Sequence, residues 1–181
     1  MEGEEEAQEG FIQGNIPLVL NSYADIFSSF DDRSFSEKAL SDDFLIECKR
    51  AARDKDDIGL ELILSIPKAK RVFSDEYKIR RRLKEHFRKH FLEKEKEIVK
   101  IKKEGIAWII IGALLVAAAV GFGTLIHGTL INTLMESILV IPGWFLIWEG
   151  MGKIFIISRE KEPDFLFYKK MANCQIAFRG H

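Results

Sequence analysis

The chain has 181 residues, of which 47% are hydrophobic and 30% charged, and its formal net charge at pH 7 is −1. Its two cysteines, Cys48 and Cys174, have neither the number nor the spacing of a disulfide framework or a zinc site, so both protein classes are excluded. The average composition hides a segregation, because the 31 residues 105–135 contain no Asp, Glu, Lys or Arg. Outside the apolar block about 130 residues remain, enough for one modest core.

Charge is also divided along the chain. Residues 1–66 have a net charge of −10, residues 67–104 a net charge of +8, and the remainder a net charge of +1. The basic block directly precedes the apolar block, where an anionic membrane leaflet would attract it. Lipid is therefore the expected partner of the basic block, in preference to nucleic acid.

Residues 1–12 are expected to form an acidic disordered tail, and their lack of an apolar core argues against a secretory signal. Residues 13–73 are expected to form a small mixed α/β region. Strands are predicted at 16–20 and 59–66, the second ending at Pro67, and helices at 23–30 and 42–53. Ser22 and Ser41 are predicted to cap the two helices.

A long amphipathic stalk helix is predicted over residues 74–104. Ser74 is a candidate N-cap, and Ile79, Leu83 and Phe87 recur every four residues on one face. No proline or glycine interrupts the pattern before Gly105, so the helix should continue into the apolar block. The basic groups of the stalk are predicted to be either solvated with glutamate partners or in contact with lipid or an acidic partner: Arg80, Arg81, Arg82, Lys100, Lys102 and Lys103.

Residues 105–150 are predicted to form a transmembrane hairpin with spans at 106–126 and 129–148. A helix needs about 20 residues to cross the hydrocarbon, and a connection as short as His127-Gly128 forces antiparallel neighbours. Lysines flank both spans, among them Lys153 after the second, whereas the turn has none, so both termini are expected in the cytoplasm. Three tryptophans are expected to mark the cytosolic interface: Trp108, Trp144 and Trp148.

Two features inside the predicted spans go beyond what an anchor requires. Small residues repeat at four-residue spacing at Ala113, Ala117 and Gly121, a pattern that packs either the hairpin itself or several copies of the chain. Pro142 is expected to kink the second span. A polar stripe is also predicted on that span, where it serves interhelical hydrogen bonds or a water-lined path: Thr129, Asn132, Thr133 and Glu136.

Residues 151–181 are expected to be a cytosolic tail that packs on the N-terminal region. A helix is predicted at 163–171, followed by a third strand at 175–178 that returns beside 59–66. Glu149 and Lys153 stand four apart in the order that favours a helical ion pair.

No arrangement of residues predicts an enzyme, a metal site or a cofactor. His86 and His90 share a helix face, but Arg88 and Lys89 make it electropositive, and the aspartates of residues 25–43 lack calcium-loop spacing. The fold class expected is an α+β membrane protein. Its expected function is a membrane-tethered, oligomeric, non-enzymatic interaction module with a cytosolic protein partner. The alternative is an oligomeric ion channel or membrane-perturbing effector built on the stripe around Glu136.

Overall fold

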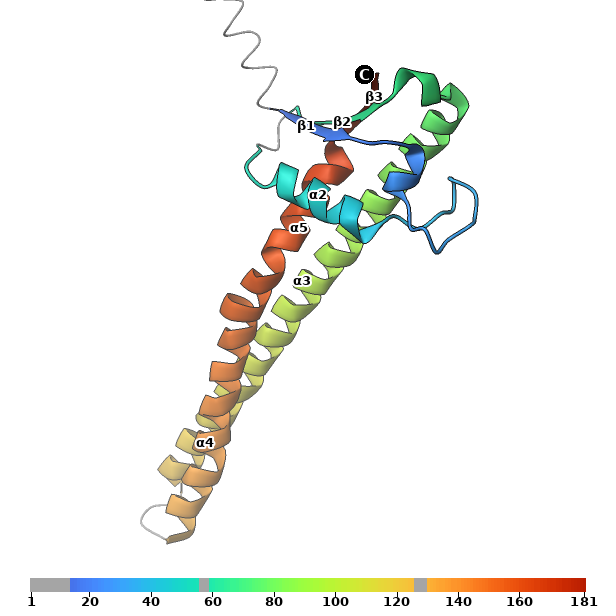
Figure 1. The fold of residues 1–181 in the computed structure, drawn as a ribbon. Helices are drawn as coiled ribbons and strands as arrows, with labels where there is room; N and C mark the ends of the chain where they lie inside the picture. Colours follow the sequence, from blue (N-terminus) through green and yellow to red (C-terminus); the bar gives the residue numbers. More distant parts are fainter. Residues whose placement is uncertain (1–13, 56–58, 126–129) are drawn as a thin grey trace, which may run out of the picture. The chain divides into compact units, whose positions relative to one another are not determined.

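The computed structural model describes residues 14–55, 59–125 and 130–181, with side chains from residue 124 to 136 described only at Leu134. The chain is mixed α+β, mostly helical, with one three-stranded sheet (Figure 1). The elements in chain order are β1 (Asn15–Val19), the 3₁₀ turn η1 (Tyr23–Ile26), α2 (Asp42–Ala52), β2 (Glu61–Ile66), the 3₁₀ turn η2 (Lys68–Lys70), α3 (Phe73–Leu125), α4 (Leu130–Gly152), the π-helical turn η3 (Lys153–Ile157), α5 (Ser158–Asn173) and β3 (Gln175–Gly180).

The chain divides into two compact units. Unit 1 comprises Met1–Leu92 and Leu166–His181, and unit 2 comprises Glu93–Phe165. Helix α3 begins in unit 1 and ends in unit 2, and α5 begins in unit 2 and ends in unit 1.

The sheet of unit 1 is parallel throughout, with β2 between β1 and β3. Leu62 stands opposite Ile16 on one side and Ile176 on the other. The sequence predicts all three strands to within two residues, and the predicted return of the last strand to the side of β2 is confirmed. Parallel neighbours require long connections, and here each is more than 40 residues long.

The core of unit 1 lies on one face of this sheet (Figure 1). Leu62, Leu64 and Ile66 alternate along β2 and point to this face, as expected from the period of two in a strand. Three helices supply the opposite layer, through Phe44, Cys48 and Ala52 of α2, Ile79, Leu83 and Phe87 of α3, and Phe167 and Met171 of α5. The predicted four-residue repeat of the stalk is therefore the core face of α3.

The local predictions are confirmed at some positions and wrong at others. Ser41 stands at the N-cap position of α2 as predicted, but its side chain makes no capping hydrogen bond. At the start of η1, Asp25 accepts the backbone N–H of Ser22 at 3.1 Å. The predicted helix at 23–30 is wrong after Ile26, because Phe27 turns extended and pairs with Leu40. Helix α3 starts at Phe73, one residue before the predicted cap, and the backbone N–H groups of Asp75 and Glu76 donate to the carbonyl of Val72.

Helix α3 runs without a break from unit 1 to Leu125, as the sequence predicts. The C-terminal half differs from expectation. The second span was expected to end at Trp148 with a separate helix after Pro163, yet α4, η3 and α5 form one uninterrupted helical run. Neither Pro142 nor Pro163 ends its helix. Two helices of the chain are thus long and apolar enough to cross a membrane.

Candidate functional site: a glycine-packed apolar helix pair and its charged flank

The apolar helices of unit 2 meet through four glycines. A Cβ added at Gly112 would lie 2.5 Å from the carbonyl oxygen of Gly143, and one added at Gly150 would lie 2.5 Å from that of Gly105. Such distances are shorter than real Cβ contacts, so only glycine allows the backbones to approach this closely. We call these four residues the glycine seam.

The glycine seam has a seven-residue spacing on both helices. Gly105 and Gly112 are seven apart on α3, and Gly143 and Gly150 are seven apart on α4. Seven residues are close to two helical turns, so each pair returns to one face. The next step of the α3 series is Ala119, of which 1% is exposed, and the next step of the α4 series is position 136.

The predicted small-residue row lies elsewhere on α3. Ala113, Ala117 and Gly121 are exposed, and a Cβ added at Gly121 would meet no heavy atom within 4 Å. The interpretation that this row packs the two helices of one hairpin is therefore wrong for the described residues. The glycines at seven-residue spacing pack the two helices together instead, and the row lies on the outer surface of the pair.

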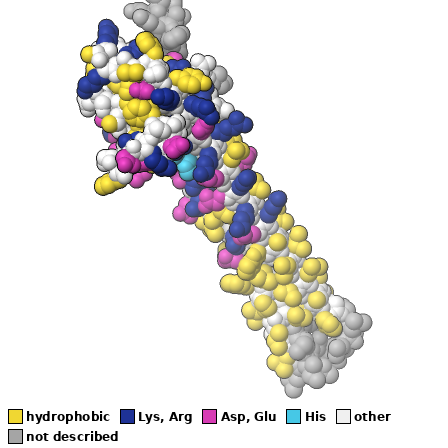
Figure 2. Space-filling model, turned by 90° about the vertical axis from the view of Figure 1, so that its right-hand side faces the viewer, with side chains coloured by type: hydrophobic (Ala, Val, Ile, Leu, Met, Phe, Trp, Pro, Cys, Tyr) yellow, Lys and Arg dark blue, Asp and Glu magenta, His cyan; other side chains and the backbone are white. Residues whose placement is uncertain are grey.

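The outer surface of the pair is apolar. Leu114 is 64% exposed and Ile141 is 69% exposed, and in Figure 2 hydrophobic side chains cover this stretch almost continuously. All three predicted interface tryptophans belong to this exposed surface, with Trp148 the most exposed at 74%. Because a soluble protein rarely exposes so large an apolar area, the surface calls for lipid or another apolar partner.

Charged side chains replace the apolar surface at one end of unit 2. Lys153 pairs with Glu104 at 3.4 Å and lies 5.7 Å from the centre of the Trp108 ring. Lys161 pairs with Glu97 at 3.3 Å, and its ammonium group, after that of Lys94, holds the pKa of the Glu97 carboxyl below its usual range. These pairs join the two helical runs just beyond the glycine seam, and we call them the charged collar.

The charged collar changes one prediction and leaves others standing. Lys153 turns to Glu104 on the other helix, where the sequence favoured Glu149 on its own helix. Lys100, Lys102 and Lys103 are exposed on the same stretch of α3, as a contact with headgroups would require. Their contact with lipid stays a prediction.

The predicted polar stripe falls largely outside the described part of the structure. Thr129 lies outside the described residues, and of Asn132, Thr133 and Glu136 only the helical backbone within α4 is described.

The predicted basic cluster on α3 belongs to unit 1. Arg80 and Arg81 are exposed, and Arg81 pairs with Glu85 at 2.8 Å. Arg82 is half-buried, and its Nε donates to the backbone carbonyl of Lys38 at 3.0 Å. Arg82 therefore holds a loop of unit 1, which the sequence did not indicate.

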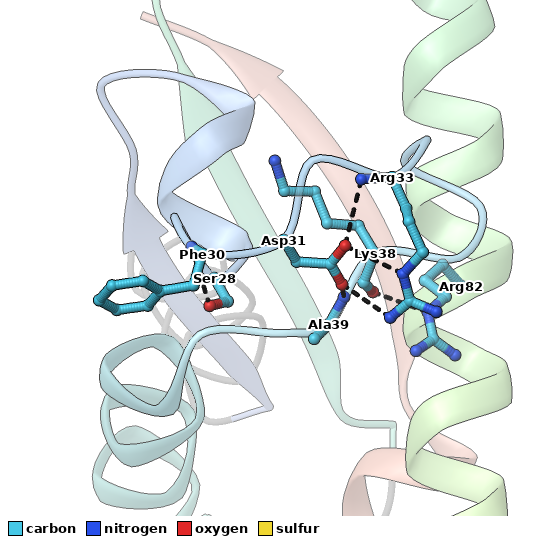
Figure 3. A network of polar contacts seen from close by, with 7 residues as sticks. All are labelled: Ser28, Phe30, Asp31, Arg33, Lys38, Ala39 and Arg82. Atoms are coloured by element: carbon cyan, nitrogen blue, oxygen red, sulfur yellow. Dashed lines mark hydrogen bonds and ion pairs between the residues drawn. The ribbon is translucent and has the colours of Figure 1, made fainter.

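That loop, residues 28–39, is organised around one carboxylate (Figure 3). Asp31 pairs with the Arg33 guanidinium through two hydrogen bonds and accepts the backbone N–H of Ala39 at 2.7 Å. The hydrogen bond from Arg33 is the main reason that the pKa of Asp31 lies well below its usual range. Phe35 stacks on Phe27 with ring centres 5.3 Å apart, whereas Phe30 is fully exposed. In the sequence, an aspartate two residues before an arginine could have indicated this ion pair.

The histidine pair lies in unit 1 beside Tyr168. The rings of His86 and His90 are 4.3 Å apart, and burial, followed by the charges of His90 and Arg82, lowers the pKa of His86 to about 4. Among the described residues no group of three or more His, Cys, Asp or Glu side chains is placed to hold a metal ion. Comparisons with protein-family models, with curated proteins and with solved structures find no match.

Proposed function

We propose that the chain is a two-span integral membrane protein whose termini both lie in the cytoplasm and whose unit 1 is a non-enzymatic interaction module. One observation carries the topology. The chain leaves unit 1 after Leu92, passes through both apolar helices and returns at Leu166, so β3 can pair with β2. A chain that returns to the same folded unit must cross a membrane an even number of times.

The charged collar supports the proposed depth of insertion. Trp108 with Lys153 above its ring, and Glu104 beside them, combine an aromatic ring with charges at one level of unit 2. Aromatic and basic side chains of this kind favour the headgroup region of a bilayer. With the collar at the cytosolic interface, the segment that connects α3 to α4 belongs on the other side; its predicted turn at His127-Gly128 lies outside the described residues.

Thiol labelling in oriented vesicles tests the topology. Phe30→Cys places a reactive group on unit 1, and Gly128→Cys places one in the turn. An impermeant maleimide should label position 30 only in inside-out vesicles and position 128 only in right-side-out vesicles. The parent protein gives the background, because Cys48 and Cys174 are buried. Labelling of both positions from the same side overturns the two-span proposal.

Self-association is the second part of the proposal. The glycine seam occupies the inner face of the helix pair, so Ala113 and Ala117 remain on the outer face, where small residues let a second copy approach closely. Crosslinking in native membranes should recover dimers or larger species, and Ala117→Leu should reduce them while Ile110→Leu does not. Recovery of monomers alone, with no other protein attached, contradicts the module.

The second candidate function is an oligomeric channel that uses the stripe of Thr129, Asn132, Thr133 and Glu136. What supports it is a group of polar residues at helical spacing in an otherwise apolar segment. Planar-bilayer recording distinguishes the two. A channel requires a conductance that Glu136→Gln alters, and silence across pH and voltage removes it.

A further inference from the structure

A groove runs along the first turns of α3 in unit 1. One half has a volume of about 290 Å³ and lies between the loop of residues 28–39 and the helix. The other half, of about 270 Å³, shares Tyr77, Arg81 and Glu85 with the first, so these three side chains line both halves. We call this the α3 groove, and the lining residues that matter for binding are Glu37, Tyr77, Arg80, Arg81, Lys84 and Glu85.

The walls of the α3 groove are predominantly cationic. Five Lys or Arg side chains face two carboxylates, those of Glu37 and Glu85. Arg81 is neutralised by Glu85. Arg80 and Lys84 are exposed one helical turn apart. Within the described residues neither has a close ion pair, although the charge of Arg80 also acts on the carboxylate of Glu76. Two cations about 6 Å apart on one helix face are thus available to an anionic ligand.

An aromatic side chain lies between the cationic positions. Tyr77 is 68% exposed and contributes to both halves of the groove. Tyrosine offers a broad apolar face at a low cost in side-chain entropy, and for this reason it is enriched where proteins bind peptides and one another. The combination of Tyr77 with Arg80 and Lys84 suits a ligand that carries both carboxylates and an apolar group.

The composition of the groove favours a peptide over other anions. Glu37 would repel the closely spaced phosphates of a nucleic acid, whereas a peptide can place its carboxylates away from it.

We propose that the α3 groove binds an acidic peptide segment of a cytosolic partner, with carboxylates at Arg80 and Lys84 and an apolar side chain against Tyr77. This inference rests on the proposed function, which makes unit 1 the interacting part. It adds the chemistry of the partner and the surface that recognises it.

Peptide binding to the full chain tests the proposal. The protein is placed in nanodiscs of phosphatidylcholine, and a fluorescein-labelled decapeptide with four glutamates around one phenylalanine is titrated by anisotropy. The combined change Arg80→Glu and Lys84→Glu should weaken binding about tenfold or more, since two attractive contacts become repulsive. Tyr77→Ala should weaken binding about fivefold. Rising NaCl should weaken the parent complex.

Matched controls make the outcomes decisive. Arg53→Glu with Arg179→Glu introduces the same charge change at exposed positions of unit 1 outside the groove, and it should alter binding less than about twofold. Equal weakening by this pair, or equal binding of a peptide with glutamine for glutamate, overturns the inference. The inference is also overturned if phosphatidylserine vesicles or a short RNA bind more tightly than the peptide and the combined change Arg80→Glu and Lys84→Glu abolishes that binding. Burial of Cys48 and Cys174 against thiol reagents confirms that each variant is folded.

The result is separable from the proposed function. Peptide binding with failed vesicle labelling keeps the groove and removes the two-span topology. Correct labelling without peptide binding removes only the groove.

Discussion

Glu76 places a carboxylate in the interior of unit 1, where 4% of the residue is exposed. The Arg71 guanidinium donates to both carboxylate oxygens, at 2.7 and 3.0 Å, and the Tyr23 hydroxyl donates to one of them at 3.0 Å. Tyr23 in turn accepts the backbone N–H of Val72. The network joins η1, the start of α3 and, through the bond from Arg71 to the Phe178 carbonyl, β3.

Glu76→Gln should therefore destabilise unit 1 by about 2 kcal/mol at pH 7, since Arg71 would lose its counter-charge and a charged hydrogen bond. The reactivity of Cys48 and Cys174 during denaturant titration measures this, because both thiols are buried in unit 1 and no other cysteine is present. Glu85→Gln, which breaks the exposed pair with Arg81, should cost much less, because solvent screens that pair. Equal effects of the two variants would contradict the role of the network.

The surroundings of Glu76 also make the free energy of unfolding depend on pH. Arg71, through its hydrogen bonds, is the main reason that the pKa of Glu76 lies below its usual value of 4.5. A depressed folded-state pKa stabilises the protein above the unfolded value, and the stabilisation is lost as pH falls through the folded pKa. The difference in unfolding free energy between the parent protein and Glu76→Gln should shrink below pH 4.5. A constant difference down to pH 3 would contradict this.

The surroundings of His86 disfavour its charged form, whereas those of Glu76 favour the charged carboxylate. Its Nε2 is buried without a hydrogen-bond partner among the described residues, and burial is the main reason that its pKa falls from 6.5 to about 4. Between these values the unfolded state binds the proton and the folded state does not, so stability falls as pH falls through this window. His86→Phe should flatten the decline between pH 6.5 and 5, measured with 4,4′-dithiodipyridine, which reacts at acidic pH. His181→Phe, at an exposed position, should leave the decline unchanged.

At the level of elements, the glycine seam yields a matched comparison on one helix. Gly112→Val forces a side chain to within 2.5 Å of the Gly143 carbonyl, whereas Gly121→Val meets open space. The first should destabilise the helix pair by about 1–3 kcal/mol, the usual cost of overpacking, and the second should not. Titration with SDS in mixed micelles, followed by tryptophan fluorescence, measures the midpoint, since all three tryptophans lie on the two helices. A lower midpoint for Gly121→Val alone would refute the assignment of the seam.

The face of α3 that packs on α4 was predicted wrongly, because the sequence of one helix does not show which residues of the second helix lie opposite. A four-residue row of Ala113, Ala117 and Gly121 satisfies the usual pattern on its own, whereas Gly105 and Gly112 become meaningful only beside Gly143 and Gly150 of the second helix. The π-helical turn Lys153–Ile157 was not predicted either. The sequence KIFII does not disfavour an ordinary α-helix, so it does not indicate the extra residue in that turn.

At the scale of the whole molecule, the strands, the continuous α3 and the two apolar helices were predictable because each rests on a local pattern. Strand β2 ends at Ile66, directly before Pro67, and α3 lacks a helix breaker over its basic half. The order of the loop at residues 28–39 was not predictable, because it depends on Arg82 of α3, 44 residues after the carbonyl of Lys38. The α3 groove was not predictable for the same reason, since that loop forms one of its walls.

The closure of unit 1 by the C-terminal strand gives the last prediction. Ile176 is 6% exposed and lies opposite Leu62, so Ile176→Asp puts a carboxylate into the core on the edge strand β3. We expect β3 to detach and unit 1 to lose several kcal/mol of stability, which would make Cys48 reactive without denaturant. Arg179→Asp, on an exposed position of the same strand, should keep Cys48 protected. Protection of Cys48 in Ile176→Asp would mean that residues 1–92 fold without the returning chain, and the structural reason for an even number of membrane crossings would be lost.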